Sequence, residues 1–171
     1  AKIMQHVGED FGILGESEKC CGLYAKDLGD RKEYDRLERE NLQMIREAGV
    51  KKVVVACGSC LRVWKEYPKA MLEGVEVMHG VEYLAEKIKS GKIKFSKTTP
   101  AKVTYHDPCH LGRGCGVYEP PRTILKAIPG IELVEMPRHG RWAWCCAGGA
   151  GILEAFPDFA RWGREDRLKE A

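Results

Sequence analysis

The chain has 171 residues, of which 44% are apolar and 31% are charged, as in folded proteins with a sizeable core. The formal net charge is only +3, and basic residues are interleaved with acidic ones, so the charge gives no support for binding to nucleic acid or an anionic membrane. No apolar run is long enough to span a bilayer, and the segment from Ala1 to His6 does not resemble a signal peptide. Since the first residue is not Met, we expect that the chain has been trimmed or processed.

The first half of the chain predicts helices and strands in alternation. A short, apolar, strand-like stretch at 11–14 precedes a loop with two cysteines. Residues 30–48 have the spacing of an amphipathic helix that ends at Gly49, and residues 51–56 predict a buried strand with three consecutive valines. The face of the helix that we expect to be buried consists of Tyr34, Leu37, Asn41, Met44, Ile45 and Ala48. The other elements expected here are a helix from the loop at 57–60 to about Tyr67, a strand at 75–78 and a helix at 81–88.

The second half repeats this alternation after a polar linker at 90–101. A predicted strand at 102–105 leads into a loop with His106 and Cys109, and Pro120-Pro121 begin a helix that runs to Ile128. The last expected elements are a strand at 131–136 and a helix from about 152 to the end. Such alternation predicts an α/β fold with a mostly parallel sheet.

The eight cysteines are the most informative part of the composition. A secreted scaffold held by disulfides would be smaller and richer in loops than this chain. We therefore expect reduced thiols and a cytoplasmic location, with any membrane association made through partners. In that setting, clustered cysteines indicate metal binding or catalysis.

The spacing of the cysteines repeats along the chain. Thirty-five residues separate Cys21 from Cys57 (22 to 56), and thirty-five separate Cys109 from Cys145 (110 to 144). Cys57 and Cys60 form a Cys-x-x-Cys pair, whose sulfurs can converge on one metal centre. Because this pair follows a predicted strand and begins a predicted helix, backbone N–H groups and the positive helix end would favour anionic thiolates.

Two vicinal pairs, Cys20-Cys21 and Cys145-Cys146, suit a cluster better than a single ion. Adjacent side chains usually diverge, so neighbouring thiolates serve one small ion poorly but can reach different irons of a larger cluster. Each pair also follows a strand-like segment and precedes a long predicted helix. This repetition indicates two copies of one unit.

These motifs resemble the CCG domain of heterodisulfide reductase subunits and related iron–sulfur oxidoreductases. The family pattern is one Cys, a long spacer, Cys-Cys-Gly, a similar spacer and Cys-x-x-Cys, present twice. Besides the cysteine motifs, the segments that match the family are 105–113 (Tyr-His-Asp-Pro-Cys-His-Leu-Gly-Arg), 118–122, 124–130 and 144–146. The resemblance covers nearly the whole chain.

The resemblance implies a non-cubane [4Fe–4S] cluster at each set of five cysteines. The ligands that it implies in this chain are Cys20, Cys21, Cys57, Cys60, Cys109, Cys145 and Cys146. It also implies an oxidoreductase subunit with redox partners, namely a flavoprotein or ferredoxin-like iron–sulfur subunit and, in some complexes, a membrane subunit. We expect two similar Rossmann-like units with mostly parallel strands, related by an approximate two-fold axis.

The chain departs from the family pattern in two ways. The first unit, which we assign to 1–95, lacks the strand and the Cys that should precede its vicinal pair. The second unit, assigned to 96–171, lacks a final strand and Cys-x-x-Cys pair, so we expect a fragment of a longer protein. In addition, Ala147 stands where the family usually has Gly, a replacement that suits the position if its φ is negative and that slightly weakens the match.

Several side chains have a structural explanation beside the functional one. His110 could donate a proton to a departing thiol, but such a His more often hydrogen-bonds its own loop. Cys115 lies outside both patterns and is expected to be a free or packed thiol. We expect His106 and Asp107 to fix the turn before Pro108.

The arginines and tryptophans near the second set of cysteines also have both a functional and a structural explanation. Arg113, Arg138 and Arg141 could attract an anionic substrate or balance cluster charge, although a structural or solvated role is favoured. Trp142 and Trp144 could shield a cluster from water, but core packing alone would explain them.

Three functions follow from these residues. The first is an oxidoreductase subunit that reduces a disulfide or thiol-linked small molecule at its own cluster. The second is an electron-transfer subunit of a hydroxyacid dehydrogenase or a flavoprotein–quinone complex. The third is a binding module in which zinc replaces iron at the first four cysteines. No Gly-x-Gly-x-x-Gly turn follows a predicted strand, so both redox functions require partners.

Overall fold

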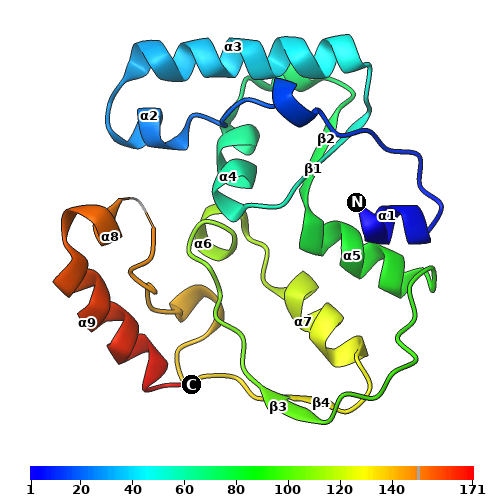
Figure 1. Ribbon diagram of the computed structural model, residues 1–171, viewed down its shortest axis with the longest axis vertical. Coiled ribbons are helices and arrows are strands. Elements are labelled where there is room, and N and C mark those ends of the chain that lie inside the picture. The colour runs from blue at the N-terminus through cyan, green and yellow to red at the C-terminus, as the bar shows by residue number, and fades with distance from the viewer. Residues whose placement is uncertain (150) are drawn as a thin grey trace.

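Two separate parallel sheets of two strands each organise the chain, with helices around them (Figure 1). The computed structural model describes residues 1–149 and 151–171. The strands are β1 (Lys52–Val55), β2 (Glu76–His79), β3 (Ala101–Val103) and β4 (Ile131–Leu133). The α-helices are α1 (Lys2–His6), α2 (Leu23–Asp27), α3 (Arg31–Ala48), α4 (Gly58–Glu66), α5 (Gly80–Lys89), α6 (Gly112–Cys115), α7 (Glu119–Ala127), α8 (Ile152–Ala155) and α9 (Pro157–Leu168). This mixture of helices and parallel strand pairs agrees with the expected α/β class.

Helix α3 forms where the sequence has a capping residue followed by apolar residues at helical spacing. The Asp30 carboxylate accepts a hydrogen bond of 3.0 Å from a backbone N–H of the first turn, and Gly49 ends the helix with a φ of 61°. Both ends agree with the predicted helix at 30–48. The buried face consists of Tyr34, Leu37, Asn41, Leu42 and Ile45. The expectation for Ala48 is wrong, because this residue is exposed, and Met44 is only half-buried.

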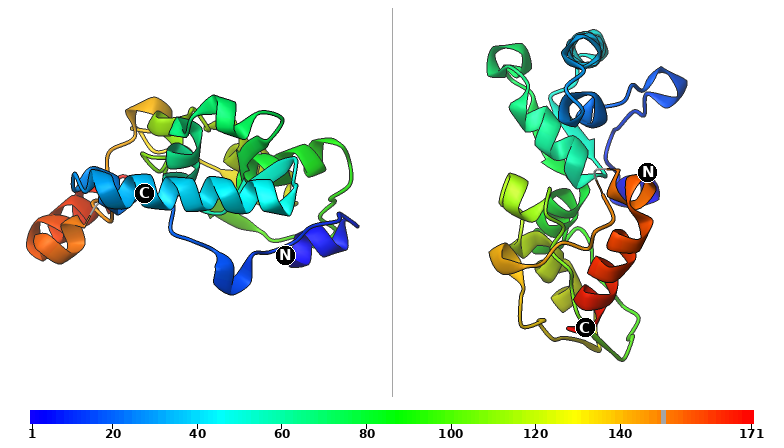
Figure 2. Two further views of the ribbon diagram at one scale, coloured as in Figure 1. Left: turned by 90° about the horizontal axis from the view of Figure 1, so that it is seen from above. Right: turned by 90° about the vertical axis from the view of Figure 1, so that its left-hand side faces the viewer.

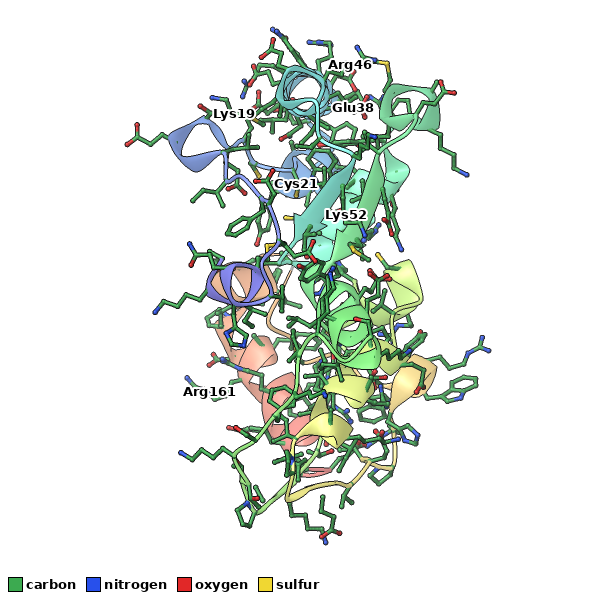
Figure 3. The ribbon with its side chains drawn as sticks, turned by 90° about the vertical axis from the view of Figure 1, so that its right-hand side faces the viewer. Lys19, Cys21, Glu38, Arg46, Lys52 and Arg161 are labelled. Atoms are coloured by element: carbon green, nitrogen blue, oxygen red, sulfur yellow. The ribbon has the colours of Figure 1, made fainter. Side chains whose placement is uncertain are left out.

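The first sheet lies beneath α3 and α4. Its strands are parallel, and Val53 of β1 pairs with Val77 of β2. The core between the sheet and the helices consists of Cys21, Leu23, Tyr34, Leu42, Ile45, Val63, Trp64 and Tyr67. Figure 3 shows Cys21 in this layer, between α3 and β1. A cysteine of the predicted site is therefore part of the hydrophobic core.

The second sheet is smaller than the sequence predicted. Strands β3 and β4 pair over three residues, from Ala101 opposite Ile131 to Val103 opposite Leu133. Each strand has a single partner, so pairing ends early and the predicted strands at 102–105 and 131–136 are shortened. The prolines expected to begin a helix do so in α7.

Helices join the two halves of the molecule. Helix α5 packs along α7, and α4 contacts α6. Leu61 of α4 is fully buried against Leu111 and Val117, with Cys115 at the margin of this small cluster. Figures 1 and 2 show α3 at one end of the molecule and the second sheet at the other, with these helices between them.

Two predicted elements differ in the structure. Residues 152 to the end form two helices, because Pro157 lacks the N–H that would continue α8 and restricts Phe156, whose φ of −141° is not helical. The apolar stretch at 11–14 is not a strand. Ile13 is 79% exposed, so this stretch lacks the buried face that stabilises a strand.

Candidate functional site

Cys20 and Cys21 lie in a tight turn before α2. The Gly22 N–H donates to the Cys20 sulfur over 3.5 Å, and Gly22 has a φ of 86°. A Cβ at this position would also lie 3.2 Å from the Tyr34 ring, so both the conformation and the space favour glycine. Cys20 is exposed and Cys21 is buried, so the two sulfurs of the pair have different environments.

Two polar side chains hold the backbone of this turn. The Asn41 amide donates to the carbonyl of Cys20 over 2.9 Å, and the Tyr67 hydroxyl donates to the carbonyl of Cys21 over 3.0 Å. Both side chains are buried. Asn41 lies on the predicted apolar face of its helix, where no function was expected of it. A single amide among apolar residues was the signal that could have identified it.

Cys57 and Cys60 lie at the start of α4, just beyond the end of β1. Cys57 precedes the first helical residue, and the N–H groups of Ser59 and Cys60 at the helix start lie close to its sulfur without forming a capping hydrogen bond to it. Burial raises the pKa of Cys57, but these N–H groups and the Ser59 side chain together lower it below the usual value. The helix start therefore stabilises a thiolate at Cys57, as the sequence predicted.

The Cys-x-x-Cys pair is linked to the first vicinal pair. The side chain of Cys60 lies close to that of Cys21, and their interaction lowers the pKa of Cys21 and raises that of Cys60. Cys20 also contacts Cys21, and Cys57 contacts Cys60. The four thiols predicted for the first site are thus connected through neighbouring pairs. Within residues 1–149 and 151–171, however, no three Cys, His, Asp or Glu side chains surround a point that could hold one metal ion.

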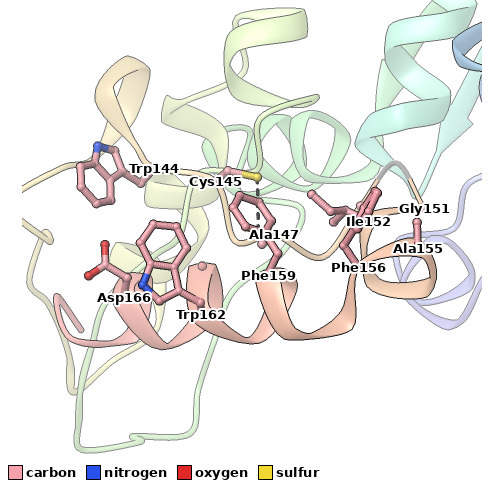
Figure 4. A pocket seen from close by; sticks show the side chains of 12 residues that line it. Trp144, Cys145, Ala147, Gly151, Ile152, Ala155, Phe156, Phe159, Trp162 and Asp166 are labelled. Atoms are coloured by element: carbon pink, nitrogen blue, oxygen red, sulfur yellow. Dashed lines mark hydrogen bonds between the residues drawn. The ribbon is translucent and has the colours of Figure 1, made fainter.

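Cys145 and Cys146 repeat the geometry of the first vicinal pair. The Ala147 N–H donates to the Cys145 sulfur over 3.3 Å, as the dashed line in Figure 4 shows. Ala147 has a φ of 51°, so it stands in place of Gly without the negative φ that would suit alanine. Gly163 of α9 accommodates this conformation, because a Cβ there would lie only 2.8 Å from the Ala147 Cβ.

Cys109 lies in a turn between β3 and α6. In the part of the chain that the structure describes, Cys109, Cys145 and Cys146 do not form a three-sulfur group. Arg113 connects their loops instead, since its guanidinium donates to the Ala143 carbonyl over 2.5 Å. This contact gives Arg113 the structural role that the sequence analysis favoured.

A buried ion pair fixes the segment before Cys109. Arg122 of α7 donates to both carboxylate oxygens of Asp107, over 2.7 and 2.8 Å, and to Glu135 over 2.7 Å. Asp107 also accepts from the Gly140 N–H over 2.6 Å. Burial raises the pKa of Asp107, but these donors lower it below its usual value. These contacts agree with the expectation that Asp107 fixes the turn. They also show that Arg122 and Glu135, for which no role was predicted, help to hold this segment.

His106 and Arg138 connect the end of the chain to these loops. The His106 Nδ1 accepts from the buried Arg167 of α9 over 3.1 Å. Arg138 pairs with Glu170, and its guanidinium carbon lies 3.1 Å from the centre of the Trp144 ring. The expected structural role of Arg138 agrees with these contacts.

His110 lies where the two cysteine motifs meet. Its Nδ1 is 2.6 Å from the Ser59 hydroxyl, and its Nε2 is 3.5 Å from the guanidinium of Arg62. Next to it, Leu111 packs on Gly58 so closely that a Cβ on Gly58 would lie 2.9 Å from the Leu111 Cβ. The loop of the second motif is therefore seated on the Cys-x-x-Cys loop of the first.

The remaining cysteine and the two tryptophans differ in how far they are buried. Cys115 packs at the margin of the small cluster between α4 and α6, and burial raises the pKa of its thiol, in agreement with a packed side chain. Trp142 is 72% exposed and stacks on Arg141, while Trp144 is 46% exposed. Core packing is therefore the wrong explanation for both tryptophans.

An apolar pocket lies beside Cys145 and has a volume of about 560 Å³. Figure 4 shows its aromatic walls, which are formed by Trp144, Phe156, Phe159 and Trp162. Asp166 is the charged residue in its lining. The second vicinal pair therefore borders an exposed apolar surface, whereas the first is partly within the core.

The sequence pattern of the cysteine-rich CCG domain family matches residues 1–64 and 103–169. Each matched segment contains one vicinal cysteine pair, and together the segments make up most of the chain. The chain therefore belongs to the cysteine-rich CCG domain family.

Similar proteins include a subunit of a larger enzyme and two other oxidoreductases. One of the subunits of the dihydromethanophenazine:CoB–CoM heterodisulfide reductase of Methanosarcina mazei is 41% identical over 177 residues, which cover 100% of this chain and 43% of that protein. The probable iron–sulfur-binding oxidoreductase FadF of Bacillus subtilis is 41% identical over 90% of this chain and 22% of its own length. The EtfAB:quinone oxidoreductase of Syntrophomonas wolfei is 40% identical over 89% of this chain and 21% of its own length.

The chain spans less than half the length of each of these relatives. No solved structure matches it. Among the helices that the structure describes, none is both long and apolar enough to cross a membrane.

Proposed function

We propose that this chain is the cluster-binding part of an iron–sulfur oxidoreductase subunit, and that Cys20, Cys21, Cys57 and Cys60 hold an iron–sulfur cluster. The observation that carries the proposal is the connected set of four thiols between α3, β1 and the start of α4. Thiolates are the usual ligands of such clusters, and a helix start favours an anionic group. The residues fit this group because Cys57 lies at a helix start, where the pKa of its thiol is lowered, and Cys20 remains accessible.

The proposal extends to a second site with Cys109, Cys145 and Cys146 as its ligands. We assign two Rossmann-like units, 1–95 and 96–171, related by an approximate two-fold axis. Each unit holds a non-cubane [4Fe–4S] cluster when its five-cysteine set is complete. The support is the repeated N–H···S turn at both vicinal pairs and the two segments that match the family.

We propose that the complete protein reduces a disulfide or thiol-linked substrate. A bound cluster would supply single electrons, and the residues that would hold it include Cys21, which is buried, and Cys20, which is exposed. The support is the 41% identity with the heterodisulfide reductase of Methanosarcina mazei over the whole of this chain. The partners in this proposal are a flavoprotein or a ferredoxin-like iron–sulfur subunit, together with a membrane subunit.

Electron transfer without disulfide chemistry is the second candidate. Its support is the similar identity, 40% and 41%, with the EtfAB:quinone oxidoreductase and with FadF. Reduction of a disulfide by the purified, pre-reduced complex separates the two functions. A complex that passes electrons to a quinone analogue but leaves small disulfides intact would favour the second.

Anaerobic reconstitution of this chain with iron and sulfide tests the cluster itself. We expect visible absorption, iron and acid-labile sulfide in the wild type, and a large loss of all three in Cys57→Ser. Cys115→Ser is the matched control, because this cysteine packs outside the proposed site and should keep the wild-type content. Stoichiometric zinc without acid-labile sulfide would instead support a zinc-stabilised binding module and refute the proposal.

A further inference from the structure

One edge of the first sheet has no strand beside it. Strand β1 pairs with β2 alone, and the register places Lys52 opposite Glu76. The Glu76 N–H donates to the Lys51 carbonyl over 2.9 Å, and in a parallel pair the residues of a strand face its two sides in turn. The backbone N–H and C=O groups of Lys52 and Val54 therefore point away from β2, to the open edge.

A groove with a volume of about 700 Å³ lies along this edge. Its lining includes most of residues 50–56, which contain β1, and also residues 9–13 near the start of the chain. The apolar side chains in the lining include Ile3, Met4, Phe11, Val54 and Leu84. Because residues 9–13 line the same groove, the open edge has room for a single strand but not for the whole sheet of a second copy.

The size of the groove matches one short strand. Strand residues rise by about 3.3 Å, neighbouring strands lie about 4.8 Å apart and packed sheets about 10 Å apart, so one strand residue fills about 160 Å³. The groove therefore holds an extended segment of about four residues. Strand β1 itself has four residues, so such a segment could pair along its full length.

Polar groups around the groove lack partners that a strand would supply. The Tyr83 side chain lines the groove and is buried, and its hydroxyl has no hydrogen-bond partner in the part of the chain that the structure describes. Among the described residues, no backbone hydrogen bond reaches Phe11, Gly12 or Ile13 either. The stretch at 11–14, which the sequence predicts to be a strand, thus lacks both a partner and an apolar cover.

We propose that this groove binds a β-strand from the part of the polypeptide outside residues 1–171, and that this strand pairs with β1 on one side and with residues 11–14 on the other. The inference rests on the proposed function, in which this chain is one part of a larger subunit. The source is supported by the relative from Methanosarcina mazei, of which this chain covers only 43%. A segment of the same polypeptide also has a high effective concentration at the groove.

The added strand would carry apolar side chains, because the groove that receives it is lined mainly by apolar ones. With a strand on each side, β1 becomes a central strand, and its backbone groups are paired in both directions. Because β1 leads directly to Cys57, the added strand also fixes the position of the Cys-x-x-Cys loop.

Hydrogen–deuterium exchange, resolved at single amides in metal-free protein, tests the added strand. In the 171-residue chain, the amides of Lys52, Val54 and Ile13 should exchange rapidly. In the complete protein, they should exchange at least about 100-fold more slowly, because they become part of a sheet. The amides of Val53 and Val55 are the internal control, since they face β2 and should be protected in both proteins.

Proline variants test the same edge through stability. Val54→Pro removes an N–H that faces the groove, so it should leave the 171-residue chain folded but lower the thermal unfolding midpoint of the complete protein. Val53→Pro is the matched variant, because it removes an N–H that faces β2 and should destabilise both proteins. An equal effect of Val54→Pro on the two proteins, with rapid exchange of Lys52 in both, would overturn the inference.

The concentration of the 171-residue chain separates the other occupants of the groove. Protection of Lys52 and Val54 that appears in this chain as its concentration rises would identify a second copy as the occupant and overturn the inference. Protection in the complete protein only after a redox partner is added would assign the groove to that partner, with the same consequence. These measurements need no iron, so failure of cluster binding and failure of the added strand are distinguished.

Discussion

The carbonyl oxygens of the first vicinal pair depend on residues outside the cysteine motifs. Asn41 binds one carbonyl, Tyr67 binds the other, and the two side chains are 3.3 Å apart at their polar atoms. Both donors come from the first core, so packing of that core positions the turn. In the contacts that the structure describes, no side chain donates to the carbonyls of Cys145 and Cys146 in the corresponding turn. That turn also has a less favourable φ at Ala147.

We expect Asn41→Leu to lower the free energy of unfolding of the metal-free chain by about 1–3 kcal/mol, because the part-buried carbonyl of Cys20 loses its partner. Urea unfolding followed by circular dichroism measures the change. Gln43→Leu is the control, since this amide bonds Glu47 on the exposed side of the same helix and its loss should cost less than about 0.5 kcal/mol. Equal losses in the two variants would contradict a special role for Asn41.

The two vicinal pairs should differ in how much metal they retain. In this 171-residue chain, the first pair has a Cys-x-x-Cys partner, whereas the second has only Cys109. Three thiolates leave a cluster without its full ligand set, and free thiolates are prone to oxidation. We therefore expect Cys20→Ser to remove more iron than Cys145→Ser after anaerobic reconstitution. Equal loss, or a greater loss in Cys145→Ser, would refute this asymmetry.

Residue spacing predicted the candidate cysteines, but not the groups that surround them. Thirty-five-residue spacers and the Cys-x-x-Cys pair are visible in the chain itself. The contacts of Asn41 with Cys20 and of Ser59 with His110 join residues 21 and 51 positions apart, which local patterns do not reveal. The positive φ of Ala147 could not be predicted from the sequence, because the preference of alanine for negative φ is strong and the room that Gly163 provides is a tertiary feature.

At the scale of elements, the sequence was sufficient to predict the ends of a helix where a capping residue or a proline marks them. Asp30 and Gly49 mark both ends of α3, and the prolines mark the start of α7. The break between α8 and α9 also had a local signal in Pro157, which the expected single helix overlooked. Strand lengths were overestimated because pairing partners set them, and each strand of the structure has only one.

His79 links β2 to α5 and should make that junction sensitive to pH. Its Nδ1 accepts from the Val81 N–H over 3.2 Å, and the backbone of Ala56 also bonds the ring, so the neutral form is required. Burial lowers the pKa of His79 below its ordinary value of 6.5. The unfolded chain therefore binds a proton more readily than the folded one, and stability falls as the pH drops through 6.5 toward the folded-state pKa.

We expect His79→Asn to reduce this dependence, since asparagine keeps a capping acceptor but does not titrate. The measurement is the urea unfolding free energy of the metal-free chain at about pH 7.5 and pH 5.5, where each pKa unit of depression corresponds to about 1.4 kcal/mol. The wild type should lose more stability between these conditions than His79→Asn. His6→Asn, which changes an exposed histidine, should behave like the wild type, and a parallel decrease in all three proteins would argue against His79.

At the scale of the whole molecule, the linker was predictable and the contact between the halves was not. The segment at 90–100 has no helix or strand, in agreement with the polar linker expected at 90–101. The contact of α5 with α7 and the burial of Leu61 against Leu111 involve elements on either side of this linker. Neither contact has a sequence signal, because an apolar helical face does not reveal which helix covers it.

Trypsin should cut the linker first and yet leave the halves together. Lys94 and Lys97 are exposed in a segment without regular structure, whereas Lys92 is held by Glu9 over 3.1 Å. Cleavage at either site divides the chain near the proposed boundary between 1–95 and 96–171. Because α5 packs on α7 and the His110 loop is seated on the Cys-x-x-Cys loop, the two fragments should elute as one species.

Size-exclusion chromatography after limited digestion, with and without urea, measures whether the fragments stay together. The variant Lys94→Gln/Lys97→Gln is the control, in which cleavage of the linker should be delayed. Separate elution of the fragments under native conditions would show that the contact between the halves does not hold them in solution.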